Sequence, residues 1–226
     1  MAKKRALTVS EDDLPELLAE VTKTAKDPIL MRAVFMLSYY AGLRVQEIAG
    51  LEWDKNIMAG PNRFLMSEAV RYNDKGKPMR HGDGTLKKRS VPSIFISSAI
   101  GKYSNERYVA MHSQLQAALS ELYNSRDTST PYVVPSGKDW ASQELPKRAH
   151  ALKMRITRIY KALGRFGFSS HSGRRSFITH GARKANAFNR SLHDVQLMAG
   201  HKNIATTQGY IDASVDNADL VEGLYT

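Results

Sequence analysis

The chain has 226 residues, 42% of them hydrophobic, so it is long enough and apolar enough to form one domain with a buried core. Its 33 lysines and arginines stand against 22 acidic residues. The resulting formal net charge of +11 favours polyanionic partners, nucleic acid first and anionic membranes second. A merely basic soluble protein has the same composition. The absence of cysteine excludes disulfides and thiolate chemistry and permits a cytoplasmic location.

Neither a membrane span nor a secretory signal is predicted. Arg32 interrupts the most apolar segment, residues 29–42, which is too short to cross a bilayer. The basic start of the chain has no apolar segment behind it. We therefore expect no membrane partner.

The first part of the chain predicts two helices behind a basic arm, residues 1–7. Thr8 or Ser10 opens the first helix, whose first turn is acidic, as the helix dipole favours. Asp27-Pro28 opens the second, with proline at the first helical position. That helix runs to about Ala41 and is apolar on nearly all sides, which predicts a central buried helix. A short helix begins after it, at Arg44.

From Asp54 to about Ser98 helical spacing disappears, and β-type runs occupy residues 63–72 and 89–96. We expect a small antiparallel sheet with a long polar connection, residues 73–88. Helices resume near residues 107–124, 146–163, 172–186, 192–199 and 204–211. The predicted fold class is α+β: a mainly helical domain with a small antiparallel sheet inserted near residues 54–98.

The stretch from Val195 to Ile211 predicts two short helices joined by a turn. Glycine after an apolar run ends a helix, so the first helix stops at Gly200. Asn203 can cap the second helix with its side-chain oxygen. His201 then lies in the turn and Tyr210 at the end of the second helix, nine positions apart.

Two further polar motifs precede this stretch. They are YAGLRVQE from Tyr40 to Glu47 and SHSGRRSF from Ser170 to Phe177. Taken alone, Arg44 would most often be a surface arginine paired with Glu47 one turn later. His171 and Arg174 would usually mark a solvated helix face, and Tyr210 a core or interface aromatic residue. In their order along the chain, however, the motifs resemble those of the tyrosine recombinases, the family of lambda integrase, Cre and the Xer proteins.

The resemblance implies a role for each motif residue. Arg44 and Arg174 would grip the non-bridging oxygens of one phosphate, for which the planar guanidinium is suited. His171 and His201 would supply hydrogen bonds and move protons. Tyr210 would attack phosphorus and form a 3′-phosphotyrosine intermediate. Because a phenol with a pKa of about 10 is a weak nucleophile, the cations would have to lower the barrier. The implied reaction needs no metal, cofactor or ATP.

The family also uses a lysine as general acid, and its position is open in this sequence. Counting eight residues back from Pro92 of Val91-Pro92 reaches Gly84, which has no acid group. Lys87 is therefore the first candidate and Lys88 the second, with Lys75 and Lys77 behind them. Alternatively, these lysines only neutralise DNA phosphates. The full set of residues expected to contact DNA is Lys3, Lys4, Arg5, Lys87, Lys88, Arg175 and Lys202.

Two local departures from the family pattern concern geometry. Gly173 stands where leucine usually precedes the second arginine, and extra residues surround positions 186–191. The resemblance covers a catalytic domain at residues 8–214. A tail, residues 215–226, would either dock on a neighbouring protomer or fold back on its own domain. The N-terminal DNA-clamping domain of most relatives has no counterpart, so we expect either a naturally short enzyme or a fragment.

The expected partners are double-stranded recombination sites, on which the family assembles as a homotetramer. The expected location is the cytoplasm of a bacterium or archaeon, or of a phage-infected cell, in association with the nucleoid. Two alternatives remain open: DNA relaxation by a type IB topoisomerase-like enzyme, and DNA binding without catalysis. An intact set of reactive residues favours an enzyme.

Overall fold

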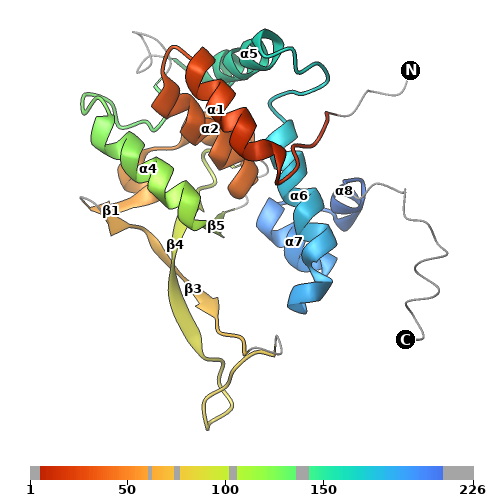
Figure 1. The fold of residues 1–226 in the computed structure, drawn as a ribbon. Coiled ribbons are helices and arrows are strands. Elements are labelled where there is room, and N and C mark those ends of the chain that lie inside the picture. Colours follow the sequence, from red (N-terminus) through yellow and green to blue (C-terminus); the bar gives the residue numbers. More distant parts are fainter. Residues whose placement is uncertain (1–5, 61–62, 74–76, 102–105, 136–142, 211–226) are drawn as a thin grey trace, which may run out of the picture.

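The computed structural model describes residues 6–60, 63–73, 77–101, 106–135 and 143–210. Helices dominate it, and antiparallel strands lie below and beside them, so the fold class is α+β as predicted (Figure 1). The α-helices are α1 (Asp13–Thr24), α2 (Pro28–Tyr40), α3 (Val45–Gly50), α4 (Ser113–Ser125), α5 (Leu145–Ala162), α6 (Ser172–Lys184), α7 (Leu192–Ala199) and α8 (Ile204–Gln208). No helix in these described ranges is long and apolar enough to cross a membrane.

Helix α2 is the centre of the core, as its sequence predicts. The Asp27 side chain accepts a hydrogen bond of 3.1 Å from the Leu30 amide and so caps the helix, and Pro28 occupies its first turn. Nearly every residue from Leu30 to Tyr39 is buried, and the helix packs against α1, α4 and α6. Gly42, with a φ of +62°, ends it and turns the chain toward Arg44. Arg44, the first arginine of the predicted site, therefore follows directly on the buried central helix.

The strands in the described residues form two antiparallel sheets, where the sequence predicts one. Strands β1 (Met58–Gly60) and β2 (Arg63–Phe64) pair after a short π-helix, η1 (Trp53–Ile57). Strands β3 (Met66–Val70), β4 (Lys88–Ile96) and β5 (Arg107–Ala110) form the second sheet, in the order β3-β4-β5. The helix expected from residue 107 is therefore wrong at its start, because residues 107–110 pair with the far end of β4 and helix α4 begins only at Ser113.

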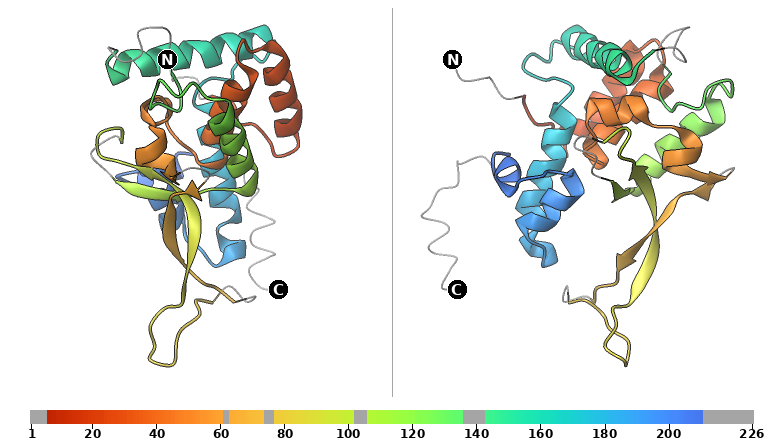
Figure 2. Two further views of the ribbon diagram at one scale, coloured as in Figure 1. Left: turned by 90° about the vertical axis from the view of Figure 1, so that its left-hand side faces the viewer. Right: turned by 180° about the vertical axis from the view of Figure 1, so that it is seen from behind.

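The β-arm, residues 66–73 and 77–92, projects away from the helical body (Figure 2). In the region expected to be a polar connection, residues 73–88, backbone hydrogen bonds continue the pairing of the strands. The Arg71 amide donates to the Lys87 carbonyl, the Lys87 amide to the Met79 carbonyl, and the Met79 amide to the Arg71 carbonyl, at 2.8–2.9 Å. The Arg190 guanidinium lies 3.7 Å from the ring centroid of Tyr72 and hydrogen-bonds its hydroxyl, so the arm is tethered to the segment before α7.

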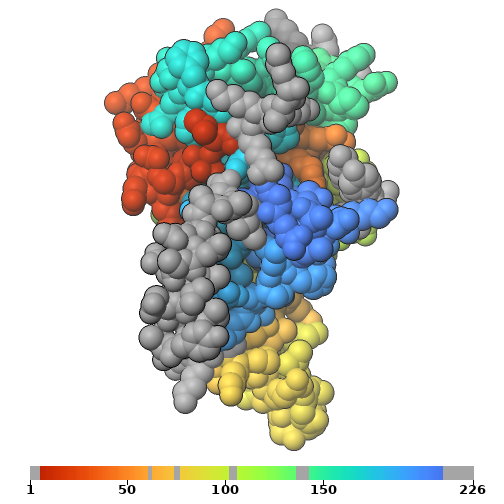
Figure 3. Space-filling model, turned by 90° about the vertical axis from the view of Figure 1, so that its right-hand side faces the viewer, coloured from red at the N-terminus to blue at the C-terminus, as the bar shows by residue number. Residues whose placement is uncertain are grey.

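Helices α6, α7 and α8 form a smaller unit on one face of the molecule, shown in blue between the N-terminal helices and the β-arm (Figure 3). Its own core contains Ile178, Val195 and Ala199. Gly173 permits its close approach to α2, because an added Cβ would lie 2.7 Å from Ser38 Oγ and 3.1 Å from the Ser38 carbonyl carbon. This packing explains why a leucine is excluded at that position.

The extra residues around positions 186–191 form a 3-10 turn, η3 (Asn186–Phe188), followed by Asn189 in the left-handed region at φ +51°. Ser191 then caps α7 by accepting from the Asp194 amide. At the other end of the chain, Leu7 and Val9 are held against α6 and its preceding loop, since the Val9 amide donates to Ser176 Oγ at 2.7 Å. The predicted basic residues 1–5 and the tail 215–226 lie outside the described residues.

Candidate active site

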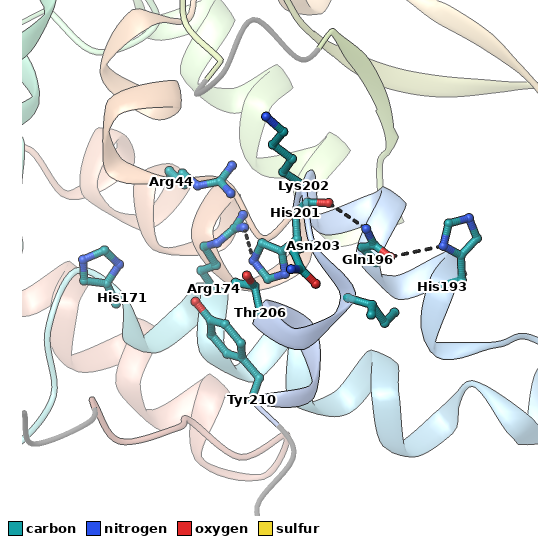
Figure 4. A pocket seen from close by; sticks show the side chains of 11 residues that line it. Arg44, His171, Arg174, His193, Gln196, His201, Lys202, Asn203, Thr206 and Tyr210 are labelled. Atoms are coloured by element: carbon teal, nitrogen blue, oxygen red, sulfur yellow. Dashed lines mark hydrogen bonds between the residues drawn. The ribbon is translucent and has the colours of Figure 1, made fainter. Parts of the chain in front are cut away.

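Five predicted reactive residues border one cavity of about 1000 Å³ (Figure 4). Arg44 comes from the start of α3, His171 and Arg174 from the start of α6, His201 from the α7–α8 turn, and Tyr210 from just beyond α8. The remaining lining residues are His193, Gln196, Lys202, Asn203, Ile204 and Thr206. Segments that are far apart in the sequence thus place two guanidiniums, two imidazoles and a phenol around one space.

Arg44 is held on two sides. One guanidinium nitrogen donates to Glu47 Oε1 at 2.9 Å and the other to the Gly200 carbonyl at 3.0 Å. The Arg44 amide also donates to Glu47 Oε2 at 2.8 Å, which fixes the first turn of α3. The Gly200 carbonyl lies at the C-terminal end of α7, where the helix dipole favours a cation. The α3 arginine is therefore connected directly to the turn that carries His201.

Arg174 is almost completely buried, with 2% of its surface exposed. It donates to the carbonyl of Gly42, which follows α2, and to that of Ala199, the last residue of α7. It also donates to His201 Nε2 at 2.9 Å. Burial, together with the positive charge of Arg44, lowers the pKa of Arg174 to about 10. The side chain remains a cation at neutral pH, and its geometry is set by the ends of two helices.

The hydrogen bonds of His201 define its tautomer. A guanidinium can only donate, so Nε2 accepts from Arg174 and the ring proton is on Nδ1. Nδ1 then donates to Thr207 Oγ1 at 2.9 Å. Burial and the nearby positive charges of Arg174, Arg44 and Arg107 together lower the pKa of His201 to about 4. His201 is therefore neutral at pH 7 in the chain without DNA.

Tyr210 lies against His201, with ring centroids 5.4 Å apart and an interplanar angle of 26°. Its amide donates to the Thr207 carbonyl, and its own carbonyl accepts from Thr179 Oγ1 at 3.1 Å, so the backbone is tied to both α8 and α6. Figure 4 shows the phenolic hydroxyl pointing toward the side of the cavity where Arg174 lies. The tyrosine thus faces the arginines within a single chain.

The turn before Tyr210 is folded as the sequence predicts. Gly200 adopts φ +64° and ends α7, and Asn203 caps α8 by accepting from the Ala205 amide at 2.9 Å. Gln196 adds a contact that the sequence does not reveal: its Nε2 donates to the His201 carbonyl at 3.0 Å. His201 is therefore fixed through both its ring and its backbone.

The other predicted site residues lie in different surroundings. His171 is exposed at the start of α6 and Lys202 is exposed at the cavity rim. Arg175 is buried, with 9% of its surface exposed, and does not line the cavity. Lys87 and Lys88 are on the β-arm outside the cavity lining, and Lys88 pairs with Glu68 at 2.7 Å. Lys3, Lys4, Arg5 and Lys75 lie outside the described residues.

Glu47 and Arg107 also belong to the site, although the sequence does not predict a role there for either residue. Glu47 is completely buried and accepts from Arg44 and, through both oxygens, from Arg107 at 3.0–3.1 Å. Burial raises the pKa of Glu47, but the hydrogen bonds and charges of Arg107 and Arg44 outweigh it and hold the pKa below its usual value. A glutamate one turn after Arg44 signals an ion pair; no local signal points to Arg107, which reaches it from β5.

The family of the chain is shown by direct comparison. Residues 8–216 match the model of the phage integrase family. The chain belongs to this family. No curated protein sequence matches it. Within the described part of this phage integrase family member, no group of three or more histidine or acidic side chains is placed to hold a metal ion.

Solved structures share the fold at low sequence identity. The XerA recombinase matches with a TM-score of 0.60 at 20% identity, over 97% of this chain and 64% of that one. A Tn1549 transposon integrase in complex with circular intermediate DNA matches with 0.62 at 15%, over 100% and 67%. The XerH recombinase bound to a palindromic difH substrate matches with 0.63 at 16%, over 99% and 53%. The present chain therefore spans about half to two thirds of the length of these relatives.

Proposed function

We propose that this chain is the catalytic part of a site-specific DNA recombinase that cleaves and rejoins DNA through a phosphotyrosine. The observation that carries the proposal is that Tyr210 shares one cavity with Arg44 and Arg174. Membership of the phage integrase family supports it, as does the +11 net charge, which suits a polyanionic substrate. The substrate proposed is a double-stranded recombination site.

In the proposed cleavage step, Arg44 and Arg174 bind the two non-bridging oxygens of the scissile phosphate. The Tyr210 oxygen forms a bond to phosphorus, while the bond from phosphorus to the 5′-oxygen of the next nucleotide breaks. Negative charge increases on the non-bridging oxygens in the pentavalent transition state, where the preorganised guanidiniums stabilise it. The products are a 3′-phosphotyrosine and a free 5′-hydroxyl.

Two proton transfers accompany this step: Tyr210 loses its phenolic proton, and the leaving 5′-oxygen gains a proton. His171, which is exposed at the cavity, accepts the phenolic proton. His201 is neutral and keeps its Nε2 lone pair toward Arg174, so its proposed role is to orient that arginine and to hydrogen-bond the phosphate once DNA is bound. The leaving 5′-oxygen receives a proton from the β-arm lysine, Lys87 first and Lys88 second. The step requires neither a metal ion nor ATP.

Rejoining is the same step in reverse. The energy of the diester bond is kept in the phosphotyrosine, so a 5′-hydroxyl from a second DNA end can attack phosphorus and release Tyr210. Exchange between two sites requires more than one active site, and we propose a homotetramer on DNA. The XerH and Tn1549 structures, each a complex with DNA, support the choice of substrate.

A nicked suicide substrate tests the central step. The nick lets the short strand diffuse away after cleavage, so a covalent protein–DNA adduct accumulates. We expect an adduct with the wild-type chain and none with Tyr210→Phe, which keeps the ring stacked on His201 but removes the nucleophile. DNA binding without an adduct in the wild type would instead identify a catalytically silent binding protein.

Two paired sites distinguish a recombinase from a type IB topoisomerase-like enzyme. The recombinase exchanges strands between the sites, whereas the topoisomerase only relaxes supercoiled plasmid. We expect strand-exchange products that depend on Tyr210. Relaxation without exchange, on plasmids that carry both sites, would favour the topoisomerase.

The lysine assignment has a separate test. DNA with a sulfur in place of the bridging 5′-oxygen has a leaving group that needs no protonation. We expect Lys87→Ala to be slow on ordinary DNA and restored on the sulfur-containing DNA. Rescue of Lys88→Ala alone would move the general acid to that residue, and rescue of neither variant would remove it from this part of the β-arm.

A further inference from the structure

Arg107 is the third arginine of the site and the least exposed to solvent after Arg174. It leaves β5 with only 10% of its side chain exposed and binds Glu47 in a bidentate pair, Nη1 to Oε1 at 3.1 Å and Nη2 to Oε2 at 3.0 Å. Bidentate arginine–carboxylate pairs combine two charge-assisted hydrogen bonds in one fixed geometry. The buried carboxylate of Glu47 therefore accepts hydrogen bonds from Arg107 and Arg44 at the same time.

The same guanidinium also supports the turn that carries His201. A Cβ added at Gly200 would lie 2.8 Å from Nη1 of Arg107 and 2.9 Å from its guanidinium carbon. Gly200 is thus packed on Arg107 on one face and accepts from Arg44 through its carbonyl. Arg107 joins the sheet to both α3 and the α7–α8 turn.

The charges explain why a third arginine belongs here. Glu47 holds Arg44 in place, but its negative charge also reduces the attraction of Arg44 for a phosphate. Arg107 offsets that charge, so the positive charges of Arg44 and Arg174 both remain available. Two uncompensated positive charges match the doubly negative pentavalent transition state better than the singly negative phosphodiester, which is the condition for catalysis.

We propose that Arg107 is a positioning residue that offsets the charge of Glu47 and thereby leaves Arg44 free to stabilise the transition state. The proposal rests on the proposed function, since it concerns the rate of Tyr210 attack. It predicts an effect on the chemical step rather than on DNA affinity, because Arg107 is bound to Glu47 and does not line the cavity that contains Tyr210.

The test measures single-turnover adduct formation on the nicked suicide substrate at saturating DNA. We expect Arg107→Met to slow adduct formation about 100-fold, because the charge of Glu47 then weakens the stabilisation of the transition state by Arg44, with a change in DNA Kd below about threefold. The deciding variant is Glu47→Gln/Arg107→Met, which removes the carboxylate together with its counter-charge. We expect it to form adduct at least about tenfold faster than Arg107→Met, because the net charge of the site is restored.

A merely structural role for Arg107 gives the opposite order, since the double variant lacks the same packing and one more ion pair. The proposal is overturned if the double variant is no faster than Arg107→Met, or if Arg107→Met is as fast as the wild type. If Arg107→Met does not fold, the adduct rate of the double variant is compared with that of the wild type instead. A loss of less than about tenfold supports the proposal and a larger loss overturns it.

The control pair is Arg32 and Glu121, which are 3.5 Å apart with nearly half of each side chain exposed. Arg32→Met makes the same substitution, arginine to methionine in an ion pair, at a residue that does not line the cavity. It is expected to leave the adduct rate unchanged. An absence of any Tyr210-dependent adduct in the wild type refutes the proposed function instead, so the two failures are distinguishable.

Discussion

The two arginines of the candidate site are positioned mainly by backbone carbonyls at helix ends. Arg44 binds the carbonyl of Gly200, and Arg174 binds those of Gly42 and Ala199. These carbonyls have no partner within their own helices, so the arginines satisfy them and are held by them at the same time. Part of each guanidinium is thereby committed to the protein, and the rest faces the cavity.

The tautomer of His201 depends on one hydroxyl group, that of Thr207. Thr207 is completely buried and accepts the Nδ1 proton, which keeps Nε2 as an acceptor for Arg174. We expect Thr207→Val to lower the free energy of unfolding by about 1–3 kcal/mol, because the buried ring N–H loses its acceptor. It should also slow adduct formation. Thr207→Ser keeps the hydroxyl and serves as the control in denaturant unfolding; equal losses in both variants would contradict the tautomer.

The pKa of His201 predicts a pH dependence of stability. The pKa is about 4 in the folded chain and about 6.5 in the unfolded chain, so the unfolded state takes up a proton first as the pH falls. The contribution of His201 to stability is therefore complete above pH 6.5, is lost between pH 6.5 and 4, and changes no further below that. We expect a loss of about 3 kcal/mol from this residue.

The measurement compares unfolding free energies at pH 7 and pH 4.5 in the wild type and in His201→Gln. Burial also lowers the pKa of His180, but that residue is common to both proteins and cancels in the comparison. The wild type should lose more stability than the variant. Equal losses would show that His201 charges as readily in the folded chain as in the unfolded one.

At the scale of elements, the crossing of α2 and α6 determines where Arg174 lies. Gly173 precedes Arg174 at the closest point of this crossing, with Ser38 atoms 2.7–3.1 Å from the position of an added Cβ. We expect Gly173→Ala to lower the free energy of unfolding by about 1–3 kcal/mol, because the helices must separate to accommodate the methyl group. Adduct formation should fall with it, since Arg174 moves with α6.

Gly181 provides a matched control on the same helix. An added Cβ there would lie 3.4 Å from the nearest Val195 methyl, an ordinary contact. Gly181→Ala should therefore raise the free energy of unfolding by about 0.5–1 kcal/mol, the gain from replacing a helical glycine. Thermal unfolding of the two variants measures the contrast, and a loss of stability at both positions would show that α6 tolerates no added methyl group.

Element boundaries were predictable where a residue acts on its own backbone. Asp27-Pro28, Gly200 and Asn203 start or stop helices through local hydrogen bonds and φ preferences, and the structure confirms all three. Residues 107–110 were not predictable in this way. Their strand exists because Ala110 pairs with Ser93 and Arg107 with Ile96, and these contacts leave no periodic pattern in so short a segment.

The residues of the site likewise fall into two groups, those that the sequence predicts and those that it does not. Residues that belong to a spaced motif could be predicted to lie together, and the structure places Arg44, Arg174 and Tyr210 on one cavity. Arg107 and Thr207 were missed because their role depends on long-range or buried contacts with Glu47 and His201. Such contacts follow from the packing of β5 and α8, which no single motif encodes.

At the scale of the whole molecule, the β-arm extends the basic surface beyond the cavity. It carries Lys87 and Lys88, two of the residues expected to contact DNA, and the contact between Tyr72 and Arg190 ties it to the segment before α7. A DNA duplex bound at the cavity is expected to meet the arm as well. The arm should then contribute phosphate contacts whose number is measurable from the salt dependence of binding.

Arg71 and Lys77 are exposed on the β-arm, whereas Lys23 and Lys26 are exposed near the C-terminal end of α1, on the opposite side of the helical body from the arm (Figure 1). We compare two double variants that remove the same formal charge. The arm variant is Arg71→Gln/Lys77→Gln, and the α1 variant is Lys23→Gln/Lys26→Gln. We expect the arm variant to reduce the slope of log affinity against log salt by about two, since each lost phosphate contact removes about 0.9. The α1 variant should leave the slope nearly unchanged, because its charges act only at long range and are screened. Equal slopes in both variants, measured by fluorescence anisotropy across a salt series, would mean that the arm does not contact the duplex and that the basic character of the chain acts only as a general field.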